Sequence, residues 1–241
     1  MQHRPLTIRL DGYLIAQFLS EKSNRRVDDY GGSVLKRARF IVEIIDAVRR
    51  VVPRSVCVGV KLNSVDHQQS SSLAEAMEQI SAIIEAGIDF LEISGGTYED
   101  PQMLRPTAKI VQGSTGSSAR EAYFLEFAHA VREQFPNVKL ILTGGFRSRA
   151  GMEAAVMDGA CDLIGLGRPA VVNQRLPNDT ILNGKVSQAE ARIMLEPVQL
   201  HWLKQWTSIR MLGAGAETVR WQDFLMLNML NMCCRAIILG N

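Results

Sequence analysis

Two glycine-rich turns each follow a short apolar run, and a basic residue closes the second turn. The first run ends in Thr-Gly-Gly at residues 143–145, and the second ends in Gly-Leu-Gly-Arg at residues 165–168. Glycine lets backbone amides approach an anion closely, and a helix that begins just after such a turn adds a favourable dipole. Arginine supplies a permanent positive charge with forked donors. The pair of turns predicts a phosphate site formed by Gly144, Gly145, Gly167 and Arg168.

Each turn taken alone is more typical of a tight connection than of a ligand site, and a single arginine is more often a surface cation. Their position at the ends of neighbouring strands favours phosphate, because loops after the last two strands of (β/α) barrels often hold one. Residues 165–170 also imitate a dinucleotide-binding fingerprint. The first glycine of that segment lies inside the strand and no acidic strand end follows at the usual distance, so a Rossmann fold is a weak interpretation.

The elements that must position these turns form an alternation of strands and helices. Four apolar runs are too unbroken for strands with one wet face and indicate buried parallel strands at residues 56–62, 88–93, 138–142 and 162–166. Residues 6–10 are a weaker fifth candidate. Apolar residues at helical spacing predict helices around Ile45, Ile80 and Phe127, and Ser-x-x-Glu boxes at Ser72, Ser118 and Ser187 predict helix starts. Alternation implies a parallel sheet, either doubly wound or part of a barrel.

Composition argues against several other classes of protein. The 241 residues include 27 basic and 25 acidic side chains, so counterion release would drive nucleic-acid binding only weakly and no nucleic-acid partner is expected. The four cysteines lack metal-ligand spacing, and the first two lie in apolar runs. We therefore expect no metal and a reduced, cytoplasmic protein. The most apolar stretch, residues 224–239, is interrupted by polar residues, which argues against a membrane span.

A longer set of motifs resembles a known family. Residues 12–20 (GYLIAQFLS), 24–26 (NRR) and 28–33 (DDYGGS) closely resemble the segment after the fourth barrel strand of Old Yellow Enzyme-like NADH:flavin oxidoreductases. Further matches follow in family order, at residues 58–64, 94–99 and 120–124 and at the two glycine turns. The resemblance implies an α/β fold, a partial (β/α)8 TIM barrel that corresponds to roughly the last four or five βα units.

The resemblance also assigns roles to individual positions. The two glycine turns would bind the phosphate of flavin mononucleotide (FMN). Lys61 falls where the family places a basic residue near the flavin N1 and C2 oxygen, and a cation there stabilises anionic reduced flavin. From the residues alone, Lys61 could be a charged strand end facing solvent, but a lysine inside so apolar a run needs a partner. Tyr13 matches the position from which the family donates a proton to the substrate carbon, whereas from the residues alone it could equally be a helix-start aromatic packed on Phe18.

The sequence departs from the family pattern near its start. Where the family has a His-x-x-His or His-x-x-Asn pair that binds the substrate oxygen, this chain has Ile8 and Asp11. Isoleucine cannot donate a hydrogen bond, and an ionised aspartate would repel an oxyanion. The family's first three βα units have no counterpart here, which is what a truncated product, an alternative start or a mispredicted exon would look like. An open barrel edge would then favour a homodimer or aggregation.

These observations predict three regions and one leading function. The regions are a divergent N-terminal segment (1–11), the C-terminal part of an FMN-binding barrel (12–185) and a C-terminal helical segment (186–241). The function is that of an FMN-dependent oxidoreductase of the ene-reductase type, with NADH or NADPH as reductant and a small molecule such as an activated alkene as acceptor. Two alternatives stay open: a non-catalytic fragment that keeps the FMN phosphate site, and a flavin-free phosphate-binding TIM-barrel enzyme.

Overall fold

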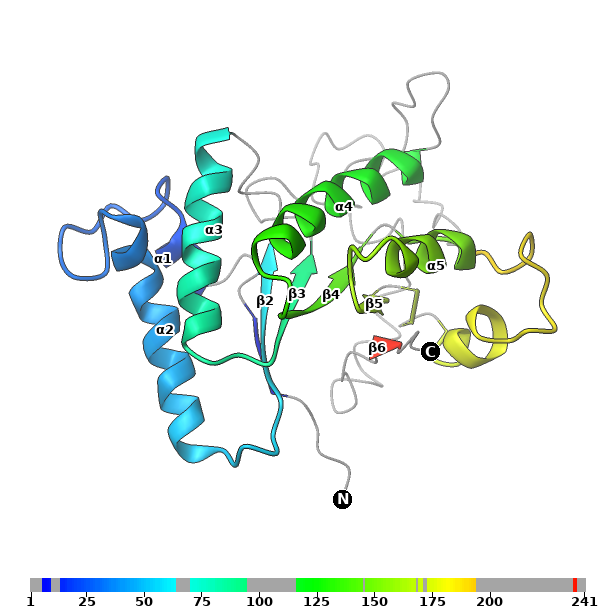
Figure 1. Ribbon diagram of the computed structural model, residues 1–241, viewed down its shortest axis with the longest axis horizontal. Coiled ribbons are helices and arrows are strands. Elements are labelled where there is room, and N and C mark those ends of the chain that lie inside the picture. The colour runs from blue at the N-terminus through cyan, green and yellow to red at the C-terminus, as the bar shows by residue number, and fades with distance from the viewer. Residues whose placement is uncertain are drawn as a thin grey trace, which may run out of the picture.

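The structure is a computed structural model that describes residues 6–9, 14–63, 70–94, 116–144, 146–167, 169–170, 173–193 and 236–237. Helices and strands alternate along most of this part of the chain (Figure 1). The strands are β1 (Leu6–Arg9), β2 (Val58–Asn63), β3 (Phe90–Ser94), β4 (Lys139–Thr143), β5 (Leu163–Gly165) and β6 (Ala236–Ile237). The helices are α1 (Leu14–Leu19), α2 (Val34–Val51), α3 (Ser70–Glu85), α4 (Gly116–Gln134), α5 (Arg149–Met157) and the π-helical turn η3 (Pro177–Ile181).

The strands form one sheet in chain order. Strands β1 to β5 pair in parallel with their sequence neighbours, and β6 pairs antiparallel with β5. All four predicted buried strands are present, as is the weaker candidate at residues 6–10. A doubly wound sheet requires the strand order to reverse, and the order of the described strands does not. The parallel α/β prediction is confirmed, and the doubly wound alternative is wrong.

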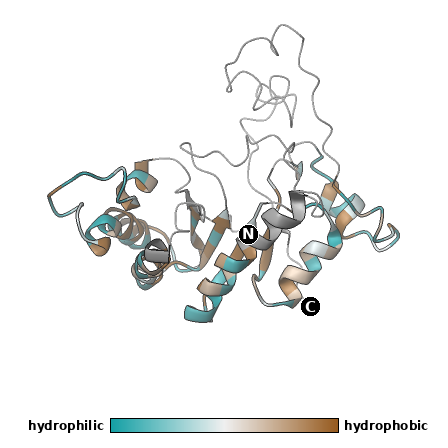
Figure 2. Ribbon diagram, turned by 90° about the horizontal axis from the view of Figure 1, so that it is seen from above, coloured by the Kyte–Doolittle hydropathy of each residue, from teal (hydrophilic) through white to brown (hydrophobic). Residues whose placement is uncertain are grey.

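The two faces of the sheet carry different side chains. Alternate residues of β2 to β5 point to the face on which the helices pack, and they are buried in the main apolar core: Val60, Leu62, Leu91, Ile93, Leu140, Leu142 and Ile164. Figure 2 shows the helices following the sheet along one side. The intervening residues belong to the opposite face, here called the second face, which includes Lys61, Glu92, Ser94, Ile141 and Thr143.

Two arginines make equivalent sets of bonds at the amino ends of the strands. Arg49 of α2 donates to the carbonyl oxygens of Gly87 and Val56, at 2.7 and 3.1 Å, and to the carboxylate of Asp89. Asp89 accepts the amide of Val58 at 2.7 Å and donates its own amide to the Val58 carbonyl at 2.7 Å. These bonds tie α2 to both β2 and β3.

Arg132 of α4 repeats this arrangement in the second half of the sheet. Its guanidinium donates to the carbonyl oxygens of Gly159 and Val138, at 3.2 and 2.9 Å, and to the carboxylate of Asp162. Asp162 exchanges amide hydrogen bonds with Leu140 in both directions, at 2.9 Å each. The units α2-β2-α3-β3 and α4-β4-α5-β5 therefore share this arrangement, and in both the arginine lies in an Ala-Val-Arg-x-x-x-Pro segment, at residues 47–53 and 130–136.

The predicted helix starts are wrong at all three capping boxes. Helix α3 begins at Ser70 and α4 at Gly116, so Ser72 and Ser118 lie inside the first helical turn and not at the N-cap. The Ser187 hydroxyl does donate to the Glu190 carboxylate at 2.8 Å, but these residues form a turn and not a helix. Apart from this turn and β6, the predicted C-terminal helical segment lies outside the described residues.

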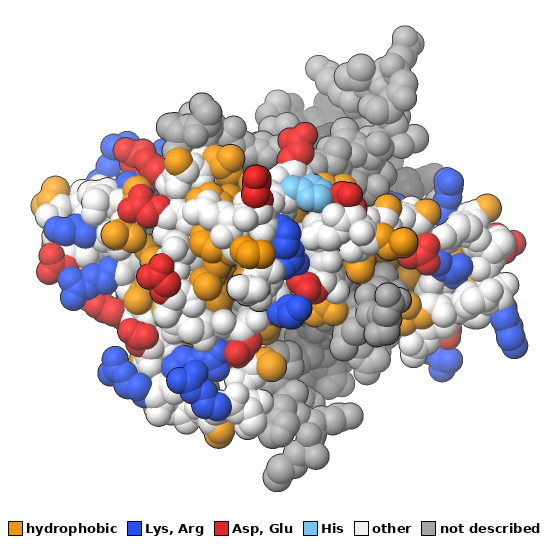
Figure 3. Space-filling view, viewed as in Figure 1, with side chains coloured by type: hydrophobic (Ala, Val, Ile, Leu, Met, Phe, Trp, Pro, Cys, Tyr) orange, Lys and Arg blue, Asp and Glu red, His pale blue; other side chains and the backbone are white. Residues whose placement is uncertain are grey.

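The outer surface carries charges of both signs (Figure 3), and the two cysteines in the described residues differ in burial. Basic and acidic side chains are interspersed over the face seen in Figure 3. None of the helices in the described ranges is both long enough and apolar enough to cross a bilayer. Cys161 is buried, and burial raises the pKa of its thiol to about 12. Cys57 is exposed just before β2, although it belongs to one of the apolar runs of the sequence.

Candidate flavin site

The carboxyl ends of the parallel strands meet at one edge of the sheet. Asn63 at the end of β2 is in register with Ser94 at the end of β3, and Thr143 of β4 is in register with Gly165 of β5. The two predicted glycine turns begin directly after β4 and β5. The structure therefore brings Gly144 and Gly167 to neighbouring strand ends, whereas Gly145 and Arg168 lie outside the described residues.

The backbone at these ends has the properties that an anion site requires. Gly144 has a φ of 132°, a conformation that L side chains rarely adopt. A Cβ placed on Gly165 would lie 1.9 Å from the Thr143 hydroxyl oxygen, so β4 and the start of the second turn approach closely. A Cβ on the exposed Gly167 would meet nothing within 4 Å. The second turn thus opens onto free space where a ligand could contact backbone.

An unsatisfied hydroxyl lies beside this space. The Oγ1 atom of Thr143 is buried and has no hydrogen-bond partner in the described part of the chain. Buried hydroxyl groups in proteins are normally hydrogen-bonded, because an unpaired one costs about 1–3 kcal/mol. A phosphate or ribityl oxygen at the edge of β4 and β5 could accept this hydrogen bond. The residues present therefore fit the phosphate end of FMN.

Helix α5 is fixed immediately behind the first turn. Ser148 is its N-cap, and the Ser148 hydroxyl accepts the amide of Gly151 at 3.2 Å. Arg149 donates four hydrogen bonds of 2.6–2.9 Å to backbone carbonyls of the segment that follows β5, those of Thr180, Ile181, Asn183 and Val186. The helix start faces the glycine edge with its partial positive charge, and the segment after β5 is anchored to it.

Lys61 lies on the second face with a carboxylate as its partner. The Lys61 ammonium is 2.6 Å from Oε1 of Glu92, which occupies the paired position on β3. The two side chains are 9% and 10% exposed. The interpretation of Lys61 as a solvent-facing strand end is therefore wrong, and the expected partner is found. Sequence reasoning did not identify Glu92, although a carboxylate inside the apolar run FLEIS is as costly to bury as the lysine.

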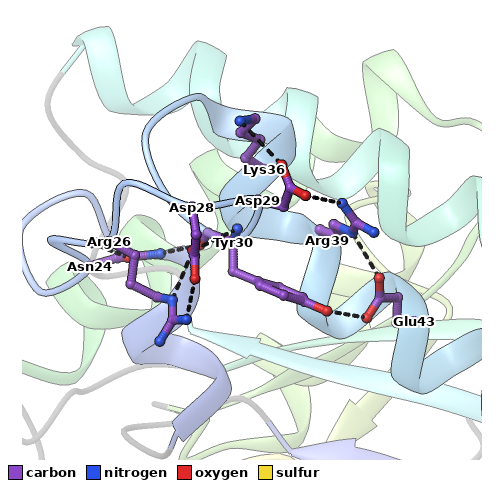
Figure 4. Close-up of polar contacts among 8 residues, drawn as sticks. All are labelled: Asn24, Arg26, Asp28, Asp29, Tyr30, Lys36, Arg39 and Glu43. Carbon is purple, nitrogen blue, oxygen red and sulfur yellow. Dashed lines mark hydrogen bonds and ion pairs between the residues drawn. The ribbon is translucent and has the colours of Figure 1, made fainter.

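Residues 24–33, which carry part of the family resemblance, form a local polar network (Figure 4). Arg26 pairs with Asp28, whose carboxylate accepts the Tyr30 amide at 3.1 Å. The Tyr30 hydroxyl donates to Glu43 of α2 at 3.0 Å, and this hydrogen bond raises the pKa of the phenol. A Cβ on Gly31 would lie 2.1 Å from the Arg26 carbonyl oxygen. These residues fix the connection between α1 and α2.

Besides Gly145 and Arg168, further residues named from the sequence cannot be placed by their side chains. Tyr13 and Asp11 lie outside the described residues, and for Ile8 only the backbone of β1 is described, paired with Val60 of β2. His129 contacts Asp158 at 2.8 Å, and both side chains are exposed. In the described ranges, no group of three or more His, Cys, Asp or Glu side chains is placed to hold a metal ion.

Comparisons with known proteins agree with this geometry. The sequence model of the NADH:flavin oxidoreductase / NADH oxidase family matches residues 8–183. An NADH-dependent flavin oxidoreductase of Hypocrea jecorina is 45% identical over 208 residues, which cover 86% of this chain and 50% of that protein. The chain thus spans about half the length of this curated relative.

Solved flavoenzyme structures share the fold. A 2-naphthoyl-CoA reductase complex matches 79% of this chain and 27% of its own, with a TM-score of 0.61 and 23% identity. A variant of morphinone reductase in complex with tetrahydroNAD matches 72% of this chain and 42% of its own, with a TM-score of 0.51 and 25% identity. These neighbours are TIM-barrel flavoenzymes. On the family match, the chain belongs to the NADH:flavin oxidoreductase / NADH oxidase family.

Proposed function

We propose that this chain forms the phosphate-binding part of an FMN-dependent oxidoreductase that uses NADH or NADPH as reductant. The observation that carries the proposal is the meeting of two glycine turns at neighbouring strand ends, next to the Thr143 hydroxyl, which has no hydrogen-bond partner among the described residues. The names of the relatives support it, since one is an NADH-dependent flavin oxidoreductase and another structure contains tetrahydroNAD.

Each proposed residue has a separate task. The backbone amides of the two turns and the Arg168 guanidinium hold the phosphate, with the dipole of α5 behind them. Lys61 presents its positive charge to the flavin N1 and C2 oxygen. Bound FMN would supply the transfer of a hydride from the nicotinamide to an acceptor such as an activated alkene. Tyr13 holds the proton that is added to the acceptor carbon, because a phenol is protonated at neutral pH.

We propose further that the fold is part of a (β/α)8 barrel, with residues 12–185 as its FMN-binding part. Five parallel strands in chain order, with helices along one side, are what an arc of such a barrel contains. Strand β6 pairs with the edge of β5, beside the second glycine turn. A barrel arc supports an FMN site at its carboxyl edge, where barrel enzymes bind their ligands.

A second candidate function is a non-catalytic protein that retains the FMN phosphate site. The residues at positions 8 and 11 favour it, because Ile8 and Asp11 cannot donate hydrogen bonds to a substrate oxygen. Under the leading proposal, groups other than residues 8 and 11 must orient the acceptor. Ene-reduction therefore requires more of the site than FMN binding does.

Flavin retention and reduction test the proposal. The purified chain incubated with FMN should keep flavin absorbance after desalting, and anaerobic NADH or NADPH should bleach it. Arg168→Gln should weaken retention, whereas Arg175→Gln should not, because Arg175 is 80% exposed and pairs only across its own surface turn with Asp179. A colourless wild-type protein would defeat the proposal.

Tyr13→Phe separates the two candidate functions. Under the leading proposal this variant is still bleached by the nicotinamide but loses alkene reduction. A wild-type protein that binds FMN but reduces no activated alkene supports the non-catalytic candidate, and unchanged alkene turnover in Tyr13→Phe contradicts the role of Tyr13.

A further inference from the structure

The buried ion pair on the second face calls for a functional reason. Lys61 and Glu92 come from neighbouring strands, their charged atoms lie 2.6 Å apart, and both side chains are about nine-tenths buried. Removing two charges from water usually costs as much as their attraction returns, so a buried ion pair is weak evidence for a stabilising role. An apolar pair at these positions would serve the sheet at least as well.

The pair lies in the middle of one row of the sheet. Strand register continues this row through the apolar residues Ile141 of β4 and Leu163 of β5 on one side, and to the position of Arg9 in β1 on the other. The next row towards the carboxyl edge contains Thr143 and Gly165, at the base of the two glycine turns. Two residues along a strand span about 7 Å, so the pair lies about one row beneath the candidate flavin edge. Charges buried at that depth in a protein are screened less than charges in water.

The partner carboxylate has two effects on Lys61. It fixes the ammonium at the end of a flexible four-carbon side chain, which would otherwise adopt many rotamers. It also offsets the lysine charge, so that the pair is neutral as a whole while its positive end remains in one place. Without Glu92, the site would lose one negative charge beside the Lys61 ammonium and would be more positive by one unit.

We infer that Glu92 is a positioning residue that holds Lys61 and, through it, limits how strongly the site favours reduced over oxidised FMN. This inference rests on the proposed flavin site and extends it to a residue on the adjacent strand. Reduced flavin is anionic when bound beside a cation, whereas oxidised flavin is neutral, so the net charge of the pair acts on the two redox states differently.

The test compares the dissociation constants of oxidised and chemically reduced FMN under anaerobic conditions. We expect the ratio of the oxidised to the reduced constant to rise about tenfold in Glu92→Gln, which removes the negative charge beside Lys61, and to fall about tenfold in Lys61→Met. Lys61→Arg keeps the charge and the pairing, so the ratio should return towards the wild-type value. Glu75→Gln is the matched control, because Glu75 pairs with Arg37 at 2.6 Å in the helix layer, and the ratio should not change.

Two outcomes would overturn the inference in distinguishable ways. If FMN binds to the wild type and the ratio stays within about twofold in both Glu92→Gln and Lys61→Met, the pair is structural only and the proposed function stands. If neither redox state of FMN binds to the wild type, the proposed function fails and the inference fails with it. Urea unfolding of the FMN-free protein gives an independent readout: each single variant should be less stable than the neutral pair Lys61→Met/Glu92→Gln.

Discussion

Arg132 repeats in the second half of the sheet the bonds that Arg49 makes in the first, to two backbone carbonyls and to one aspartate that precedes a strand, and it donates in addition to the Pro136 carbonyl. Each aspartate also exchanges amide hydrogen bonds with the preceding strand. Both clusters lie at the amino ends of the strands, opposite the candidate flavin edge. In barrels, residues at this end serve stability and those at the carboxyl end serve chemistry.

Removing one of these aspartates should therefore destabilise the fold without a direct effect on flavin. Asp162 accepts from Arg132, from the Leu140 amide and from Lys139, and it is 28% exposed. Asp162→Asn should lower the free energy of unfolding by about 2 kcal/mol, the usual worth of a hydrogen bond to a charged group. Urea denaturation measures the change. The exposed pair of Arg175 and Asp179 provides the control, since Asp179→Asn should change stability by less than about 1 kcal/mol. Equal losses in the two variants would contradict the prediction.

The same carboxylates should make stability depend on pH in the acid range. Burial alone would raise the pKa of Asp89 and of Asp162, but the arginine and backbone amide hydrogen bonds outweigh it and lower both pKa values below the ordinary value of 3.8. A lowered pKa means that the ionised form stabilises the fold above pH 3.8, and that this stability is lost as the pH falls through that value towards the folded-state pKa. The urea midpoint should drop between pH 5 and pH 3. An equally steep drop in Asp89→Asn/Asp162→Asn would show that other groups cause it.

The close approach of β4 and β5 should make Gly165 intolerant of any side chain. Gly165→Ala would place its Cβ 1.9 Å from the Thr143 hydroxyl oxygen, and such overpacking typically costs about 1–3 kcal/mol. Thr143→Ala removes that oxygen, so the double variant should be more stable than the sum of the single changes predicts. Gly184→Ala is the control, because its Cβ would meet nothing within 4 Å. Additive effects at residues 143 and 165, measured by urea unfolding, would rule out the contact.

The strands could be predicted from the sequence, but most of the side-chain contacts between the strands and helices could not. Residues 140–142 are apolar without interruption, which is typical of a strand buried on both faces, and all three are buried in β4. Glu92 was missed because its relation to Lys61 depends on strand register, which brings together residues far apart in the chain. The bonds of Arg49 and Arg132 go largely to backbone carbonyls, which every residue type possesses, so the arginines alone do not reveal their partners. The segment Ala-Val-Arg-x-x-x-Pro, which occurs at residues 47–53 and 130–136, is a signal of the shared arrangement that was missed.

The candidate site could be predicted where glycine marks a backbone requirement. Gly144 and Gly167 lie at neighbouring strand ends as expected, because parallel strands in chain order place consecutive carboxyl ends together. The predicted helix starts were wrong because each helix begins two residues earlier. Ser70 and Ser71 precede Ser72 in α3, and Gly116 and Ser117 precede Ser118 in α4. Short polar side chains are compatible with both a cap and a first turn.

The central claim is that the two glycine turns form a phosphate cradle, and the affinity difference between FMN and riboflavin tests it most directly. Riboflavin has the same ring and ribityl chain but lacks the phosphate. Titration of the purified chain, followed by quenching of flavin fluorescence, should give a dissociation constant for FMN at least about a hundredfold lower than that for riboflavin, as expected for a doubly charged group on several charge-assisted hydrogen bonds. Equal affinities for the two flavins, or no binding of either, would contradict the account.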